Sequence, residues 1–299
     1  MNILDMVGNT PLFELKKIDE TLSDIRLFAK AEFFNPSGSI KDRAAKAMIL
    51  DGIKRGALTK DKIIIDATSG NTGIAYAMIG AVLGYRVRLY MPQNASVERK
   101  QLIKNFGAEI VETDPLEGSD GAFLKAKEIY EAQKEKYFYP NQYNNPLNPQ
   151  THYENTGVEI LRQTENKITH FITSAGTSGT FVGVSRRLKE FNTQIKTVLI
   201  QPDSPFHGIE GTKHLKSTIM PGIFSEQNID EIIPISTQEA YETAIKLVRI
   251  EGIFSGISSG ANVAAALKLA KKAPKGSIIV TMLCDSGTRY LSDPFWNQK

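Results

Sequence analysis

Apolar runs rich in β-branched residues alternate along the chain with longer segments that have helical periodicity. In the first half, Ser96 is suited to cap a helix and Gly107 to end it. The pattern predicts, in chain order, strand 62–66, helix 73–84, strand 85–92, helix 96–107, strand 108–113, helix 121–136 and strand 137–140. A further helix is expected to begin near Lys41.

A second series of the same kind follows an Asn/Pro-rich connection at residues 141–150. The stretch 207–228 within this series is less regular. The series is predicted as helix 153–163, strand 169–174, helix 179–191, strand 196–202, helices 239–251 and 262–271, and strand 277–284.

This alternation favours an α/β fold with parallel strands and right-handed crossovers. The turn-rich connection between the two series indicates two doubly wound, mostly parallel sheets in two lobes with a cleft between them. Ligands bind such sheets at the carboxyl ends of the strands. Three loops rich in Gly, Ser and Thr follow predicted strands or precede predicted helices, at residues 68–73, 176–180 and 256–260.

Composition narrows the class of protein. The 299 residues are 41% hydrophobic and 23% charged, which supports a packed core. A formal net charge of +3 without a dense basic cluster argues against a nucleic-acid binder. We expect no membrane span, and the N-terminus lacks a signal-peptide pattern, so the protein is predicted to be cytoplasmic.

Cysteine and histidine give no sign of metal binding. Cys284 is the only cysteine, and it is interpreted as buried filler rather than a nucleophile. The four histidines lack the spacing of metal ligands, so no metal site is predicted. They are His152, His170, His207 and His214.

The loop "GTSGT", residues 176–180, leads from a predicted strand into a predicted helix. Glycines expose backbone amides there, hydroxyls add donors, and a helix N-terminus favours an anion. The loop lacks the lysine of a nucleotide P-loop and the glycine spacing of a dinucleotide site. It therefore indicates either a single phosphate group or a plain turn.

The loop "TSGNTG", residues 68–73, repeats the arrangement in the first half. The hydroxyls of Thr68, Ser69 and Thr72 are suited to bind a carboxylate, although one or two of them could merely cap the helix. Lys41 follows a Pro-Ser-Gly-Ser turn at the start of a helix. A lysine beside two anion-binding loops suggests a phosphate-bearing carbonyl ligand, namely pyridoxal 5'-phosphate, whereas a lone lysine is usually solvated.

Five motifs carry a resemblance to a known family: "NPSGSIKDR", "TSGNTG", "GTSGT", "GISSGA" and "DSGTRYLS". Their order and spacing resemble those of the cysteine synthase (O-acetylserine sulfhydrylase) and cystathionine β-synthase family. The likeness extends from "VGNTPL" to "RYLS" and is closer to the M-type cysteine synthases. It implies the tryptophan synthase β-like fold of pyridoxal-phosphate enzymes, fold type II. It also implies a smaller mobile lobe at 40–144 and a larger lobe, 1–39 and 145–299, carrying the phosphate loop.

The resemblance implies a role for each matching residue. Lys41 matches the Schiff-base lysine, Asn71 the residue at the ring hydroxyl of the cofactor, and Ser258 the hydroxyl at its pyridine nitrogen. The phosphate loop corresponds to Gly176, Thr177, Ser178, Gly179 and Thr180. The groups that bind the substrate carboxylate correspond to Thr68, Ser69, Thr72 and Gln142.

Two departures from the family pattern stand out. Ser178 replaces the middle glycine of the usual phosphate loop. The segment "GTKHLKSTIMPGIF" lacks the arginine pair common in M-type enzymes. In that segment Lys213, His214 and Lys216 either shape the acceptance of a second substrate or are solvated, and we favour the solvated interpretation.

The resemblance implies synthesis of L-cysteine and acetate from O-acetyl-L-serine and sulfide. Alternatives within the class are cystathionine or lanthionine synthesis, use of O-phosphoserine, and cysteine β-elimination that releases sulfide. A non-catalytic relative that binds an amino acid or a partner is a different class, against which the matching lysine, asparagine and serine argue. Besides an amino acid and a sulfur nucleophile, the resemblance implies a second copy of the chain as partner, in a homodimer. The sequence leaves open whether a serine acetyltransferase docks.

Overall fold

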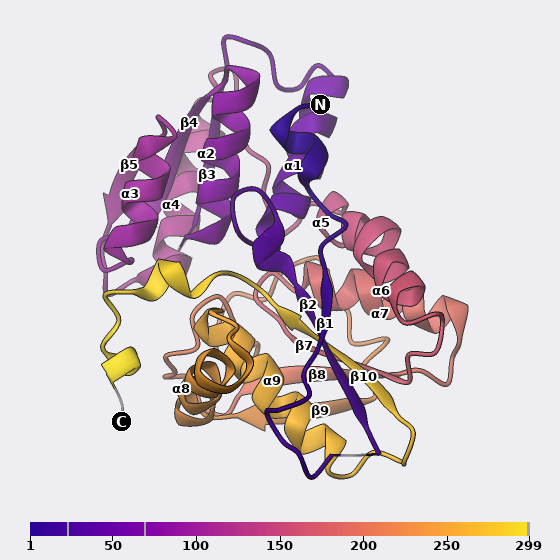
Figure 1. Cartoon of the computed structure of the whole chain (residues 1–299). Coiled ribbons are helices and arrows are strands. Elements are labelled where there is room, and N and C mark those ends of the chain that lie inside the picture. The colour runs from indigo at the N-terminus through magenta and orange to yellow at the C-terminus, as the bar shows by residue number, and fades with distance from the viewer. Residues whose placement is uncertain (23, 69, 298–299) are drawn as a thin grey trace.

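The computed structural model describes residues 1–22, 24–68 and 70–297, and its strands form two separate sheets (Figure 1). The larger sheet has the strand order β1-β2-β10-β7-β8-β9, in which only β1 runs antiparallel to its neighbour. The bounds of these strands are β1 Leu12–Glu14, β2 Arg26–Ala31, β7 His170–Ser174, β8 Lys196–Pro202, β9 Glu231–Ile235 and β10 Ile278–Leu283.

The smaller sheet is entirely parallel and has the order β5-β4-β3-β6. All of its strands lie between residues 63 and 138, inside the predicted smaller lobe. The boundaries of that lobe and its mobility stay predictions. The strand bounds are β3 Ile63–Ala67, β4 Arg86–Pro92, β5 Glu109–Thr113 and β6 Tyr137–Phe138.

Helices cover both faces of each sheet, as the doubly wound fold class requires. On the smaller sheet, residues of α1 and α2 pack against one face and residues of α4 against the other. On the larger sheet, α8 and α9 pack on one face, and α6 and α7 on the other. The helix bounds are α1 Lys41–Lys54, α2 Asn71–Leu83, α3 Val97–Asn105, α4 Gly118–Ala132, α5 Leu147–Thr151, α6 Gly157–Gln163, α7 Gly179–Phe191, α8 Thr237–Lys246 and α9 Ile257–Ala270.

Local sequence signals explain several helix ends. The Ser96 side chain accepts a hydrogen bond from the Arg99 amide and caps α3, and Gly107 adopts a positive φ of 83° just beyond the helix. Gly84 ends α2 in the left-handed conformation. Helix α7 and strand β8 have the predicted bounds.

Several sequence predictions differ from the structure. Helix α4 ends at Ala132, four residues before the predicted end. The predicted helix 153–163 is a π-helical turn, His152–Thr156, followed by α6, and the predicted helix 239–251 is α8 followed by the π-helical turn Leu247–Glu251. Helix α9 starts at Ile257 rather than at residue 262, which places the motif "GISSG" at its N-terminus. Strands β1, β2 and β9 were not predicted.

Candidate active site

A cavity of about 410 Å³ lies where the carboxyl ends of strands from both sheets meet. Its lining includes Thr68 after β3, Pro92 at the end of β4, and Gly176 after β7. A smaller space of about 30 Å³ adjoins it and is lined by the 176–180 loop, Ser258 and Cys284. Lys41 borders both spaces.

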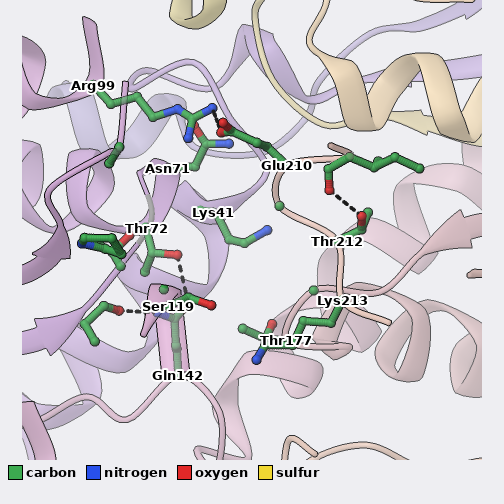
Figure 2. Close-up of a pocket in the computed structure, with 18 of the residues that line it drawn as sticks. Lys41, Asn71, Thr72, Arg99, Ser119, Gln142, Thr177, Glu210, Thr212 and Lys213 are labelled. Atoms are coloured by element: carbon green, nitrogen blue, oxygen red, sulfur yellow. Dashed lines mark hydrogen bonds and ion pairs between the residues drawn. The ribbon is translucent and has the colours of Figure 1, made fainter. Parts of the chain in front are cut away.

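Lys41 is the first residue of α1, and its side chain points into the larger cavity (Figure 2). The turn before it is held by the end of β10, because the amide of Ile40 donates to the carbonyl of Cys284 at 2.9 Å. Gly38 in this turn has a φ of +85°, a conformation that favours glycine. The turn singled out from the sequence therefore fixes where the lysine side chain starts.

A buried ionic network anchors the first turn of helix α1, two residues after Lys41. Arg43 donates to both oxygens of Glu32 and of Glu159, and Lys30 lies 2.8 Å from Glu159. Burial opposes the charged form of Glu159, but Arg43 and Lys30 outweigh it and lower its pKa to about 2. The network holds the helix that carries Lys41 against β2 and α6.

Asn71 is the first residue of α2 and borders both cavities. Just before it, the hydroxyl of Thr68 accepts hydrogen bonds from the amides of Gly70 and Gly73. Thr68 thus shapes the loop at the start of the helix as well as lining the cavity. Ser69 lies outside the described residues, so its predicted role is still a prediction.

Thr72 and Gln142 meet although they are 70 residues apart in the chain. The hydroxyl of Thr72 donates to Oε1 of Gln142 at 2.8 Å, and Nε2 of Gln142 donates to the carbonyl of Ala67 at 3.0 Å. Both side chains line the larger cavity next to the N-terminus of α2 (Figure 2). The structure therefore brings together the described members of the predicted carboxylate site.

The 176–180 loop runs from β7 into the N-terminus of α7. Ser178 has a positive φ of 71°, so it adopts the left-handed shape that a glycine would take there more easily. Its hydroxyl is buried and has no hydrogen-bond partner among the described residues. Asn148 braces the loop by donating to the hydroxyl of Thr177 at 3.0 Å.

Ser258 is the second residue of α9 and lines the smaller space. Cys284 lies in the same lining, and burial raises the pKa of its thiol to about 11. A thiol with this pKa is protonated near neutrality, so Cys284 is a poor nucleophile. The raised pKa supports the interpretation that Cys284 is no nucleophile, but its side chain is partly exposed and borders the space rather than being buried filler.

Two ion pairs join the lobes beside the larger cavity, which Arg99, Glu210 and Lys213 line. Arg99 of α3 pairs with Glu210 (Figure 2), and Lys213 donates to Asp120 of α4 at 2.8 Å. Lys213 is only 7% exposed, so the favoured solvated interpretation is wrong for this residue. It holds for Lys216, which is exposed.

The comparisons with known proteins identify the family. Residues 3–285 match the family described as "Pyridoxal-phosphate dependent enzyme". The chain belongs to this family. It is 50% identical to the cysteine synthase of Aquifex aeolicus, over 99% of this chain and 92% of that protein. It is 44% identical to cysteine synthase B of Salmonella typhimurium, over 98% of this chain and 95% of that one.

Among solved structures, that of a cysteine synthase from Entamoeba histolytica superposes with a TM-score of 0.94. It is 38% identical, and the match covers 100% of this chain and 91% of that chain. The predicted fold type II architecture and the expected cofactor, pyridoxal phosphate, are thereby confirmed.

The residues of this pyridoxal-phosphate dependent enzyme fit the cofactor. The unpartnered hydroxyl of Ser178 needs an acceptor, and a phosphate oxygen at the N-terminus of α7 would supply one. The backbone is closely packed here, because a Cβ at Gly176 would lie 2.3 Å from the carbonyl oxygen of Gly211. A phosphate cradle, a lysine amine and a side-chain amide therefore border one connected space.

Several residues at the site were not found from the sequence. Asp285 and Arg289 contact Asn71, although the motif that contains them had been quoted only for the resemblance. Arg99, Glu210 and Asp120 carry no motif of their own. Their positions depend on loops that meet only in the folded chain.

None of the helices among the described residues combines the length and apolar character needed to cross a bilayer. In the same residues, no group of three or more His, Cys, Asp and Glu side chains is placed to hold a metal ion.

Proposed function

We propose that the protein catalyses β-replacement, converting O-acetyl-L-serine and sulfide to L-cysteine and acetate. The observation that carries the proposal is the placement of Lys41 between the phosphate-type loop at 176–180 and the carboxylate-type loop at 68–73. The loop at 176–180 suits the cofactor phosphate, and the loop at 68–73 suits the carboxylate of an amino acid. A lysine between them can reach both the cofactor and the amino acid.

Each residue has a distinct task in this proposal. Lys41 would hold the cofactor covalently, and its amine would remove the α-proton of the substrate as a general base. Thr68, Thr72 and Gln142, with the start of α2, bind the substrate carboxylate. Pyridoxal phosphate, when bound, supplies the electron sink that lets the α-proton and then the β-substituent leave.

The remaining residues bind and tune the cofactor. The loop of Gly176, Thr177, Ser178, Gly179 and Thr180 would hold its phosphate, and Asn71 would donate to its ring hydroxyl. Ser258 would lie at the pyridine nitrogen, where a hydroxyl favours protonation less than a carboxylate would. A weaker sink suits β-elimination and addition better than transamination.

Replacing the lysine tests the assignment. We expect Lys41→Ala to lose the visible absorption band of the covalently bound cofactor and to lower kcat by about 10³-fold or more, because covalent anchor and base are both removed. Absorption spectra, borohydride reduction followed by mass spectrometry, and steady-state rates measure this. Lys54→Ala, at the exposed far end of α1, is the matched control and should leave all three unchanged.

A substrate panel separates the candidate reactions. O-acetyl-L-serine with sulfide should give the highest kcat/KM. Faster turnover of serine with homocysteine would favour cystathionine synthesis, and faster sulfide release from cysteine would favour elimination. Borohydride labelling that persists in Lys41→Ala would reject the assignment of the lysine.

We further propose that the protein is cytoplasmic and forms a homodimer. We also propose that the smaller lobe, residues 40–144, moves over the cleft between the lobes. The support is the resemblance to the family and the smaller sheet's position within those residues. Light scattering after size exclusion measures the mass, and a monomer at micromolar concentration would contradict the dimer. Co-elution tests whether a serine acetyltransferase docks, which the sequence leaves open.

A further inference from the structure

The side-chain amide of Asn71 lies between two opposite charges from the end of the chain. Its Nδ2 donates to Oδ2 of Asp285 at 2.6 Å, and Nη1 of Arg289 donates to its Oδ1. A carboxylate can only accept hydrogen bonds and a guanidinium can only donate them. The two partners therefore impose the same orientation on the amide.

The surroundings make the opposite orientation unfavourable. Asp285 is fully buried and Arg289 is 2% exposed, so water cannot compensate for a mismatched contact. Turning the amide over would place its oxygen against the carboxylate and its NH₂ group against the guanidinium. Oδ2 of Asp285 is fixed in turn by a hydrogen bond from the hydroxyl of Tyr290 at 2.7 Å.

The same two residues also hold the turn that precedes Lys41. Nη2 of Arg289 donates to the carbonyl of Ser37, and Asp285 forms an isolated antiparallel bridge with Ser39. The segment after β10 thus contacts both the lysine turn and the start of α2. These two elements are far apart in the chain and border the same cavity.

We propose that Asp285 and Arg289 are positioning residues that fix the amide of Asn71 with its NH₂ group available to the cavity. One N–H is used by Asp285, and the other has no partner among the described residues. A ring oxygen of the cofactor therefore always meets a donor and never the amide oxygen. The inference rests on the proposed contact between Asn71 and the cofactor.

An exchange of donor and acceptor tests this arrangement. In Asn71→Asp, two buried carboxylates face each other, so the melting temperature should fall by about 5 °C or more. In Asn71→Asp/Asp285→Asn, the amide at 285 donates to the carboxylate at 71, which still accepts from Arg289. The melting temperature should then recover at least half of the loss.

The double variant should recover stability but not its affinity for the cofactor. Both variants lack the N–H that faces the cavity, so the dissociation constant for pyridoxal phosphate should rise about tenfold in each. The visible band of the bound cofactor should be shifted in both. Melting is measured with cofactor in excess and again after its removal, and binding is measured by fluorescence titration.

Glu98→Gln is the matched control. Glu98 accepts from the amide and hydroxyl of Ser292, so this change loosens the same C-terminal segment without touching Asn71. It should leave the cofactor band and affinity unchanged. If the cofactor absorption band shifts in this control, loosening the C-terminal segment is enough to disturb the cofactor. Asp285 and Arg289 would then have no specific effect on the Asn71 amide, and the proposal would be overturned.

Two other results would overturn it. The exchange variant could be no more stable than Asn71→Asp, or it could regain the cofactor band together with its stability. If Asn71→Asp is insoluble, its melting temperature cannot be measured, and solubility takes its place. A soluble Asn71→Asp/Asp285→Asn protein then supports the proposal, and an insoluble one contradicts it. Failure of the proposed function would give a different result. The protein without any substitution would then carry no cofactor linked to a lysine.

Discussion

Asp66 shows how a single buried side chain ties the site to pH. It is fully buried at the end of β3, where it accepts hydrogen bonds from the amide of Ala67 at 2.8 Å and the hydroxyl of Tyr76 at 2.9 Å. Burial outweighs these bonds and raises the pKa of Asp66 from 3.8 to about 7. The next two residues, Ala67 and Thr68, line the larger cavity.

The sign of the pH effect follows from this raised pKa. The neutral form of Asp66 is favoured in the folded state, so its contribution to stability is full below about pH 4 and is lost as the pH rises to about 7. Asp66→Asn keeps the shape of the neutral carboxyl. Relative to the unmodified protein, the variant should gain up to about 4 kcal/mol of unfolding free energy between pH 4 and pH 8.

Urea unfolding at a series of pH values measures the difference between the two proteins. Asp24→Asn, at an exposed carboxylate, is the control and should give no such trend. If the unfolding free energies of Asp66→Asn and of the unmodified protein change with pH in parallel, ionisation of Asp66 does not destabilise the folded state, and the prediction is wrong.

At the scale of elements, close approach between helices decides where α7 and its loop lie. A Cβ at Gly183 of α7 would lie 2.1 Å from the carbonyl oxygen of Pro149 in α5 and 2.9 Å from the amide of Tyr153. These are backbone atoms, which cannot move aside as a flexible side chain can. The glycine therefore sets the spacing between the helix that starts at the phosphate loop and its neighbour.

Gly183→Ala has two opposite effects on stability, a gain in helix propensity and a loss from overpacking. Alanine favours a helix interior by about 1 kcal/mol over glycine, but overpacking against backbone costs about 1–3 kcal/mol or more. We expect a net loss of about 2 kcal/mol in unfolding free energy. Denaturant unfolding measures it.

Gly56→Ala gives a useful comparison. Its Cβ would meet nothing within 4 Å, but its φ is +68°, so the change isolates the cost of a left-handed alanine, about 1–2 kcal/mol. The cofactor affinity should fall in Gly183→Ala and not in Gly56→Ala, since only α7 carries the phosphate loop. Unchanged stability in Gly183→Ala would show that α5 and α7 can separate freely.

At the scale of the whole molecule, charged contacts hold the two lobes together across the cavity mouth. Lys213, in the segment between β8 and β9, reaches Asp120 on α4, and the amide of Ile219 donates to the same carboxylate at 3.1 Å. Arg99 and Glu210 form a second contact of this kind. Paired charges beside the larger cavity therefore link the two lobes.

A charge exchange tests this dependence. Asp120→Lys places two ammonium groups together, so the mouth should open and KM for the amino-acid substrate should rise about tenfold, as for a loss of about 1.4 kcal/mol. Asp120→Lys/Lys213→Asp restores the pair and should recover most of the affinity. Steady-state kinetics at two salt concentrations measure it. Equal KM values in the single and double variants would contradict the role of the pair.

Much of the fold could be predicted because local signals agree with it. The strand–helix alternation, the cap at Ser96 and the stop at Gly107 depend on neighbours within a few residues. The strands β1 and β9 were missed because they are short and partly exposed, and pairing with a neighbour defines them. Strand β2 has six residues and is mostly buried, but charged residues interrupt its apolar run. The start of α9 was missed because Ser258, Ser259 and Gly260 in its first turn resemble a loop.

The sequence by itself determined the class of fold, through the alternation of strand and helix patterns. It also singled out the Gly/Ser/Thr motifs and Lys41, because each motif depends on residue types at short, fixed spacing. The tertiary structure alone decided which distant residues meet: Thr72 with Gln142, Asp120 with Lys213, and Asn71 with the end of the chain. The physical reason is that these contacts form across 70 or more residues. Their geometry is set by how helices and sheets pack, which no local pattern encodes.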